Sequence, residues 1–251
     1  MIERYSLPDM DALFSDVARF GRYLEIELHA LDAQASLGVV PSAAAIACRA
    51  RAPQIDAEFV QAVSEREAIT NHDVAAFVDV VQERIGGADA TWVHHGLTSS
   101  DVVDTAWCAM LRDAAELIDA SLGELIAVLV REARAHQDTP MIGRTHGIHA
   151  EPTTFGAKVA LWALQVDRDR RRMKAARFTV SVCKLSGAVG TYSNIDPRVE
   201  EHVAQAMGLR AVPATQVVSR DRHAEFLSAC ASIAGTVEMI AVELRHLQRT
   251  E

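Results

Sequence analysis

The stretch WCAMLRDAAELIDASLGELIAVL, residues 107–129, decides the fold. Its apolar residues recur every three or four positions, which is the period of one face of an α-helix, for roughly six turns. The stripe consists of Trp107, Met110, Leu111, Leu117, Ile118, Leu122, Leu125 and Leu129. A helix of this length must bury its apolar face against other helices, so the stretch predicts a long-helix bundle.

Further stretches show the same helical period. Residues 11–37 and 154–176 each predict one helix, and residues 42–85 contain shorter helical patterns that stop at Gly86 and Gly87. Between Phe226 and Leu247 the apolar residues alternate spacings of four and three, which is typical of a coiled-coil seam. No run alternates apolar and polar residues between hairpin turns. We therefore predict an all-α fold.

Polar interruptions divide these stretches into two expected domains. Residues 1–99 predict a small helical N-terminal domain, and residues 100–251 predict a central helical-bundle domain. The last helical pattern reaches Glu251 without a stop signal. We therefore expect the bundle to be incomplete and the chain to belong to a longer sequence.

The composition excludes several classes of protein. A chain of 251 residues with 49% hydrophobic content can bury a substantial core, and a net charge of -9 argues against a general nucleic-acid binder. The four widely spaced cysteines indicate reduced core thiols. The acidic, proline-containing start is unlike a secretory signal, and no long uninterrupted apolar run indicates a membrane span. These features predict a soluble cytoplasmic protein.

The segment GRTHGIHAEP, residues 143–152, combines groups that can hold an anion and move a proton. Arg144 offers a cationic fork, Thr145 a hydroxyl and His146 an imidazole that titrates near neutrality. The alternative is a structured turn in which His149 and Glu151 cap the next helix. We prefer the turn interpretation for His149 and a functional interpretation for His146.

Two more polar segments precede helical runs. Thr98, Ser99 and Ser100 offer hydroxyls and unpaired backbone N–H groups to a carboxylate. The alternative is helix capping, in which Ser99 or Ser100 is the N-cap. Asp101 and Asp104 then interact favourably with the positive end of the helix dipole. In TNHD, residues 70–73, Asp73 either caps the following helix or orients the imidazole of His72. A lone histidine in that setting is usually structural.

Histidine pairs also raise the question of a metal site. His146 and His149 have an H-x-x-H spacing, and His94 and His95 are adjacent. Zinc would need a third ligand in a recognisable pattern, such as H-E-x-x-H, and the sequence contains none. We predict no metal site.

Six segments together carry a family resemblance. MIERYS, NHDVAAF, WVHHGLTSSDVVDTA, GRTHGIHAEPTTFG, KLSGAVGTYSNID and TQVVSRDRH, in this order, resemble the adenylosuccinate lyases of the fumarase/aspartase superfamily. The resemblance implies a homotetramer around a long-helix bundle, with each active site assembled from three subunits. It implies anti β-elimination of fumarate from adenylosuccinate, giving AMP, and from succinyl-aminoimidazole-carboxamide ribotide in purine biosynthesis. It implies no metal or organic cofactor.

The resemblance also assigns roles to residues. The expected catalytic histidines are His146, as the acid that protonates the departing nitrogen, His72, near the succinyl group, and His94. The expected substrate-binding residues are Arg4 and Tyr5 for the phosphate, Asn71, His72 and Asp73 as a contact triplet, Thr98 and Ser99 for a succinyl carboxylate, Thr145, and Gln216. Ser219 and Arg220 are nearby candidates of lower weight.

The sequence departs from the family in one respect. Family members are far longer, and their flexible serine loop, GSSxMPxKxNP, which supplies the general base and a lysine, is absent from these 251 residues. We therefore expect the fragment alone to be inactive. Three alternatives remain: a sister lyase for another succinyl compound, an inactive helical scaffold that associates with a complete lyase and donates His146 in trans, and a metal-dependent hydrolase.

Overall fold

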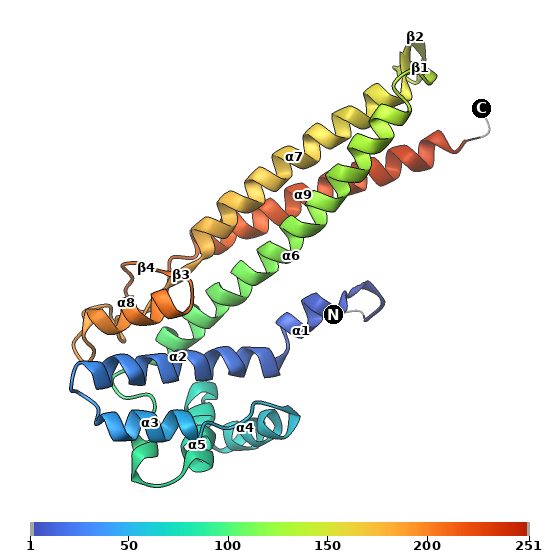
Figure 1. Cartoon of the computed structure of the whole chain (residues 1–251). Helices are drawn as coiled ribbons and strands as arrows, with labels where there is room; N and C mark the ends of the chain where they lie inside the picture. The colour runs from blue at the N-terminus through green and yellow to red at the C-terminus, as the bar shows by residue number, and fades with distance from the viewer. Residues whose placement is uncertain (1–2, 250–251) are drawn as a thin grey trace. The chain divides into compact units, whose positions relative to one another are not determined.

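The computed structural model describes residues 3–249 and is built almost entirely from helices (Figure 1), which confirms the predicted all-α class. The chain forms two compact units. One combines the residues up to Ala114 with Val180–Arg220, and the other combines Ala115–Thr179 with the residues from Asp221 onward. The units thus interleave along the sequence, and the predicted division between residues 99 and 100, next to the start of α6 at Ser99, stays a prediction.

The first unit contains short helices, the beginning of α6 and a minimal sheet. Its elements are η1 (Glu3–Tyr5), α1 (Pro8–Leu13), α2 (Asp16–Ser36), α3 (Ser42–Ala50), α4 (Ala57–Thr70), α5 (Asp73–Ile85), η2 (Ala88–Trp92), the first part of α6 (Ser99–Ala135), β3 (Val182–Cys183), α8 (Pro197–Ala206) and β4 (Arg210–Ala211). Strands β3 and β4 pair in parallel.

The core of the first unit contains a cluster of aromatic rings. Phe20 of α2 stacks on Phe77 of α5 with ring centroids 5.5 Å apart, and Tyr23 meets Phe77 edge-on at 5.4 Å.

The helix predicted for residues 11–37 is divided, because the Ser15 side chain accepts a hydrogen bond from the Ala18 amide at 3.1 Å and starts α2 as its N-cap. Apolar periodicity continues across such a cap and so conceals it.

The second unit consists of long helices and a hairpin. It contains the remainder of α6, β1 (Pro140–Thr145), β2 (Ile148–Thr154), nearly all of α7 (Phe155–Val180) and α9 (Asp221–Leu247). Leu122, Leu129, Trp162, Val166 and Ile240, from the three helices, form its apolar core. The sequence showed no hairpin pattern at residues 140–154, where the structure has the antiparallel pair β1 and β2.

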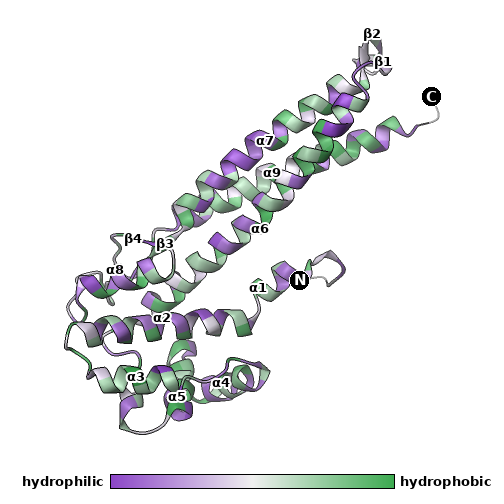
Figure 2. Ribbon diagram, in the orientation of Figure 1, coloured by the Kyte–Doolittle hydropathy of each residue, from purple (hydrophilic) through white to green (hydrophobic). Residues whose placement is uncertain are grey.

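Helix α9 carries hydrophobic residues along its length (Figure 2), and several of them are exposed. Val237, Leu244 and Leu247 of the predicted seam are each at least 40% exposed, whereas Phe226 and Ile240 are buried. Within residues 3–249, α9 is also the one helix that is long and apolar enough, by length and composition alone, to cross a membrane, with a mean hydropathy of 1.5. Its four-three spacing equally fits a helix that packs among other helices.

Candidate functional site

Polar loops of the first unit meet through close backbone contacts at two glycines. Gly96 has a φ of +76°, and a Cβ added there would overlap the carbonyl oxygen of Asn194. Gly190 has a φ of +81°, and a Cβ there would overlap the carbonyl oxygen of Ala214. Only glycine permits both this conformation and this approach. The segments HHGLTSSD, SGAVGTYSN and ATQVVSR therefore form one packed group of loops.

His72 and Ser99 lie 27 positions apart in sequence and form a hydrogen bond. The Nδ1 atom of His72 accepts from the Ala75 amide at 3.2 Å, so His72 itself is the N-cap of α5. Since Nδ1 then provides a lone pair, the neutral ring carries its proton on Nε2. Nε2–H therefore donates to Ser99 Oγ at 3.3 Å. This pairing gives the imidazole a fixed tautomer and leaves its side chain half exposed.

Asp73 has neither of the two roles expected from the sequence, because His72 itself caps α5 and that capping bond orients the ring. Its carboxylate lies 3.5 Å from Nδ1 of His72, but that nitrogen already accepts from a backbone N–H, so we attribute the orientation of the ring to the cap. Asn71, the residue before His72, ends α4 in the left-handed conformation with a φ of 51°. Asn71, His72 and Asp73 together form the junction between α4 and α5.

The start of α6 presents hydroxyls while a carboxylate makes the capping bond. The helix begins at Ser99, and Asp101 Oδ2 accepts from the Thr98 amide at 2.9 Å. This is one half of a capping box. Because the helix begins at Ser99, its N-cap position falls on Thr98 and not on Ser99 or Ser100 as the sequence indicated, and the Ser99 hydroxyl is bonded to His72 instead. Thr98 and Ser99 are both half-buried at this end of α6.

Asp101 and Asp104, near the start of α6, are buried and bind groups from two loops. They do so in addition to the interaction with the helix dipole that the sequence predicted. Lys184 and Asp101 are both fully buried, and Nζ of Lys184 donates to Asp101 Oδ1 and to the Gly187 carbonyl, each at 2.6 Å. Asp104 accepts from the Val218 amide at 2.7 Å and from Arg220 at 3.1 Å. Arg220 is therefore held by an ion pair beside the candidate site.

A second buried carboxylate supports the loop that leads to Tyr192. Glu200 accepts from the Leu185 amide and from the Tyr192 hydroxyl, both at 2.8 Å. Burial, followed by the hydrogen bond to Glu200, raises the pKa of Tyr192 to about 12. The phenol therefore stays protonated as a donor at neutral pH.

His94 is held by a buried glutamate that sequence reasoning missed. Glu27 of α2 has no exposed surface, and its two oxygens accept from Nδ1 of His94 at 2.6 Å and from the His94 amide at 2.9 Å. Burial alone lowers the pKa of His94, but the hydrogen bond and the charge of Glu27, with the charge of Asp101, outweigh burial and raise it. His94 has a φ of 68°.

The remaining predicted residues of the first unit lie on its surface. Arg4 and Tyr5 are exposed in η1, where the Arg4 guanidinium lies 4.8 Å from the centroid of the Tyr5 ring. Gln216 is exposed in the loop between β4 and α9. Within residues 3–249, no hydrogen bond joins these three side chains to the histidines described above.

Thr145 and His146 belong to the second unit, on the hairpin of β1 and β2. Thr145 pairs with Ile148 across the turn, so His146 and Gly147 are its two central residues, with φ values of 54° and 75°. Two consecutive positive φ values define a type I′ turn, in which glycine or asparagine is usual. A positive φ is uncommon for any residue other than glycine, although histidine adopts it more often than most. Both Thr145 and His146 are exposed.

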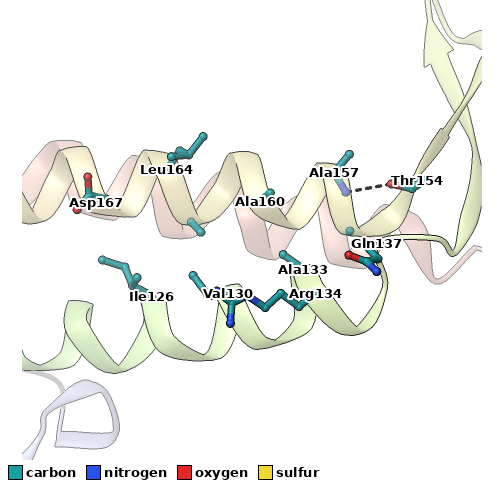
Figure 3. A pocket seen from close by; sticks show the side chains of 12 residues that line it. Ile126, Val130, Ala133, Arg134, Gln137, Thr154, Ala157, Ala160, Leu164 and Asp167 are labelled. Atoms are coloured by element: carbon teal, nitrogen blue, oxygen red, sulfur yellow. Dashed lines mark hydrogen bonds between the residues drawn. The ribbon is translucent and has the colours of Figure 1, made fainter.

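The hairpin borders a polar cavity of about 580 Å³ in the second unit. Arg144 lines it together with Lys158, Glu243, His246 and Arg249, and Lys158 forms an ion pair with Glu243. A separate apolar groove of similar volume lies between α6 and α7 (Figure 3). Its lining includes the small side chains of Ala133, Ala157 and Ala160.

Within the part of the chain that the structure describes, no group of three or more His, Cys, Asp or Glu side chains is arranged to hold a metal ion. The four cysteines are free thiols, and burial raises the pKa of Cys183 far above its ordinary value. Neither observation points to a nucleophilic thiol. The candidate chemistry is therefore that of imidazoles, hydroxyls and cationic groups.

Comparisons with known proteins give the family. A family model described as a lyase matches residues 4–251. Two curated relatives named adenylosuccinate lyase are those of Deinococcus radiodurans, 48% identical over 254 residues, and Bacillus subtilis, 46% identical over 252 residues. Both alignments cover 100% of this chain, but 58% and 57% of the relatives respectively. The chain thus spans somewhat more than half the length of these relatives.

Solved structures of related enzymes have the same fold as this chain. A fumarate lyase from Mesorhizobium sp. BNC1 matches with a TM-score of 0.88 and 30% identity over 96% of this chain and 57% of that chain. A 3-carboxy-cis,cis-muconate lactonizing enzyme from Pseudomonas putida matches with a TM-score of 0.89 and 31% identity over 98% of this chain and 57% of that chain. The chain therefore belongs to the lyase family of the fumarase/aspartase superfamily, and relatives that it matches at 43–48% identity are named adenylosuccinate lyase.

Proposed function

We propose that this chain forms part of an adenylosuccinate lyase, which eliminates fumarate from adenylosuccinate and from succinyl-aminoimidazole-carboxamide ribotide in purine biosynthesis. The observation that carries the proposal is the 43–48% identity to relatives of that name along the whole chain. The candidate residues fit the chemistry, since they combine hydroxyls, imidazoles and arginines without a reactive thiol.

The proposed reaction needs two proton transfers and a site for negative charge. In an anti β-elimination, a base removes a carbon proton beside a carboxylate, and an acid protonates the nitrogen as the C–N bond breaks. We assign the acid to His146, the carboxylate contact to Thr98 and Ser99, and the phosphate contact to Arg4 and Tyr5. The base is expected from the serine loop, which these 251 residues lack.

The assignments to two units agree with an active site shared between subunits. His146 lies on a hairpin of the second unit, while Thr98 and Ser99 lie in the first. We propose a homotetramer in which such elements from different copies meet. The exposed apolar residues of α9 and the small-residue groove between α6 and α7 are surfaces that a second copy can cover. A soluble cytoplasmic location is also part of this proposal.

The function is tested with the whole protein that contains this chain. We expect fumarate release from adenylosuccinate and not from argininosuccinate, followed by ultraviolet absorbance. His146→Ala should lower kcat by roughly 100-fold or more, because it removes the proton donor. His149→Ala is a matched control on the same hairpin, because His149 lies three residues away and is also exposed. Loss of activity in both variants to the same extent would contradict the assignment of the acid.

The shared-site arrangement has its own test. The 251-residue chain is mixed with a complete adenylosuccinate lyase whose histidine equivalent to His146 has been replaced. Activity restored by the wild-type chain but not by its His146→Ala variant would support donation of the acid in trans. Absence of restored activity from a mixture that does co-assemble would contradict it.

A second candidate function is a sister lyase that acts on another substrate. The structural match to a lactonizing enzyme at 31% identity favours this alternative, because it indicates that the same helical scaffold supports more than one kind of chemistry. A panel of succinyl substrates distinguishes the two candidates. Preference for any of them over adenylosuccinate would favour the sister lyase.

A further inference from the structure

The backbone of Val93, His94 and His95 is held by three side chains from neighbouring helices. Gln82 of α5 donates to the Val93 carbonyl at 3.2 Å, and Gln34 of α2 donates to the His95 carbonyl at 2.8 Å. Between them, Glu27 accepts from the His94 amide at 2.9 Å. Three consecutive residues outside any helix are thus tied to the unit, which fixes His94 in its left-handed conformation.

Glu27 is the one of the three that also bonds a side chain. Its second oxygen lies 2.6 Å from Nδ1 of His94, a distance typical of a charge-assisted hydrogen bond. Nδ1 must therefore carry a proton that it donates to the carboxylate. Within residues 3–249, no hydrogen bond engages Nε2, and the His94 side chain is 21% exposed.

We propose that Glu27 is a positioning residue that presents Nε2 of a cationic His94 to an anionic group of the substrate, a carboxylate or a phosphate. The inference rests on the proposed function for its substrate, but the geometry of the pair does not depend on it. The carboxylate fixes the tautomer and orientation of the ring, and its buried charge favours the imidazolium.

The charges around this pair agree with a cationic ring. Glu27, from α2, is fully buried, and within residues 3–249 the hydrogen bonds that its carboxylate accepts come from His94, so a neutral ring would leave its charge uncompensated. Asp101, from α6, is the other acid that acts on His94, and its own charge is balanced by Lys184. Glu27 therefore supplies the main uncompensated negative charge at His94.

The first experiment measures the ring directly in the 251-residue chain. Nitrogen-15 NMR of the His94 imidazole, titrated across neutral pH, should show that the ring loses its second proton at a pH above the ordinary histidine value, and that Nδ1 keeps its proton in the neutral form. Glu27→Gln should lower the pKa of His94 by about one unit or more, because the charge is removed while the size is kept.

Gln82→Met provides the matched control, because it removes a tie to the same loop without touching the ring. It should reduce stability but leave the pKa of His94 at its wild-type value. If both variants change that pKa equally, the loop rather than the carboxylate sets it, and the proposal fails. If Glu27→Gln does not fold, the wild-type titration still decides, since a ring that is neutral at pH 7 or lacks a proton on Nδ1 would overturn it.

The second experiment measures catalysis in the whole protein. Glu27→Gln should reduce kcat/KM by roughly 10–100-fold and displace the pH profile in the same direction as the pKa of His94. In the background of His94→Gln, the Glu27→Gln change should cost no further activity, because Glu27 acts through the ring. A full additional loss there would contradict the proposal. A correct NMR titration without lyase activity would retain the positioning pair and reject the proposed function instead.

Discussion

Replacing Gly96 by alanine tests whether the packed loops depend on close backbone approach. Gly96 has a φ of +76°, and its added Cβ would lie 3.3 Å from the Asn194 carbonyl carbon and closer still to the oxygen. Neither partner is a flexible side-chain end, so one of the two loops must move. Gly38 is a matched control, because its φ is +74° but a Cβ there meets nothing within 4 Å.

The loss of stability in each variant has up to two causes: the left-handed backbone conformation of the alanine and the steric overlap of its Cβ. Gly38→Ala should cost only the left-handed backbone penalty, about 1–2 kcal/mol. Gly96→Ala adds overpacking of about 1–3 kcal/mol, so the total should be roughly 2–5 kcal/mol. The difference between the variants isolates the collision with Asn194.

Urea unfolding of the two variants measures these costs. Trp92 and Trp107 report on the first unit, and Trp162→Phe removes the fluorescence of the second. Activity of the whole protein should also fall for Gly96→Ala, since the loop carries His94, Thr98 and Ser99. Equal destabilisation by Gly96→Ala and Gly38→Ala would refute the argument that the loops are in contact at this glycine.

Three further predictions concern charges and chemistry. Lys184→Met should lower the free energy of unfolding, measured with urea, by about 3–5 kcal/mol, because it leaves Asp101 buried without its cation. Lys158→Met should lower it by less than about 1 kcal/mol, because the pair of Lys158 and Glu243 is partly exposed. Similar losses in the two variants would show that the pair of Lys184 and Asp101 is not buried. Because the folded pKa of His94 is raised, its stabilising effect is complete below its ordinary value of 6.5 and is lost as the pH rises through the folded pKa. The stability advantage over His94→Gln should therefore decrease with rising pH, and an advantage that grows instead would contradict the sign. The 251 residues alone should release no fumarate from adenylosuccinate, and release that depends on His146 would disprove that expectation.

Helical periodicity predicted most of the fold, because long amphipathic helices repeat one signal over many residues. The hairpin was not predicted, because its burial alternates only weakly, Gly143 sits at a bulge and Pro152 lies within β2. The histidine in its turn also concealed a signal that asparagine would have given.

The candidate site residues could be predicted from sequence motifs, but the buried residues that hold them in place could not be predicted from local sequence. Glu27 and His94 are separated by 67 positions, and Asp101 and Lys184 by 83. A lone charge in a helical pattern resembles an exposed residue until its distant partner is known. Lys184 gave one usable signal, since it is one of only three lysines and is flanked by apolar residues on both sides.

The interleaving of the two units imposes an order on biosynthesis. Asp101 is translated 83 residues before Lys184, and at 5–20 residues per second the ribosome needs roughly 4–17 seconds to supply the ammonium group. Throughout that interval the carboxylate must remain hydrated, so the first unit cannot close, while the hairpin and α7 have already been made. The nascent chain is therefore expected to make α6 and α7 before it seals the loops that carry the candidate site, whereas α9 is made after them.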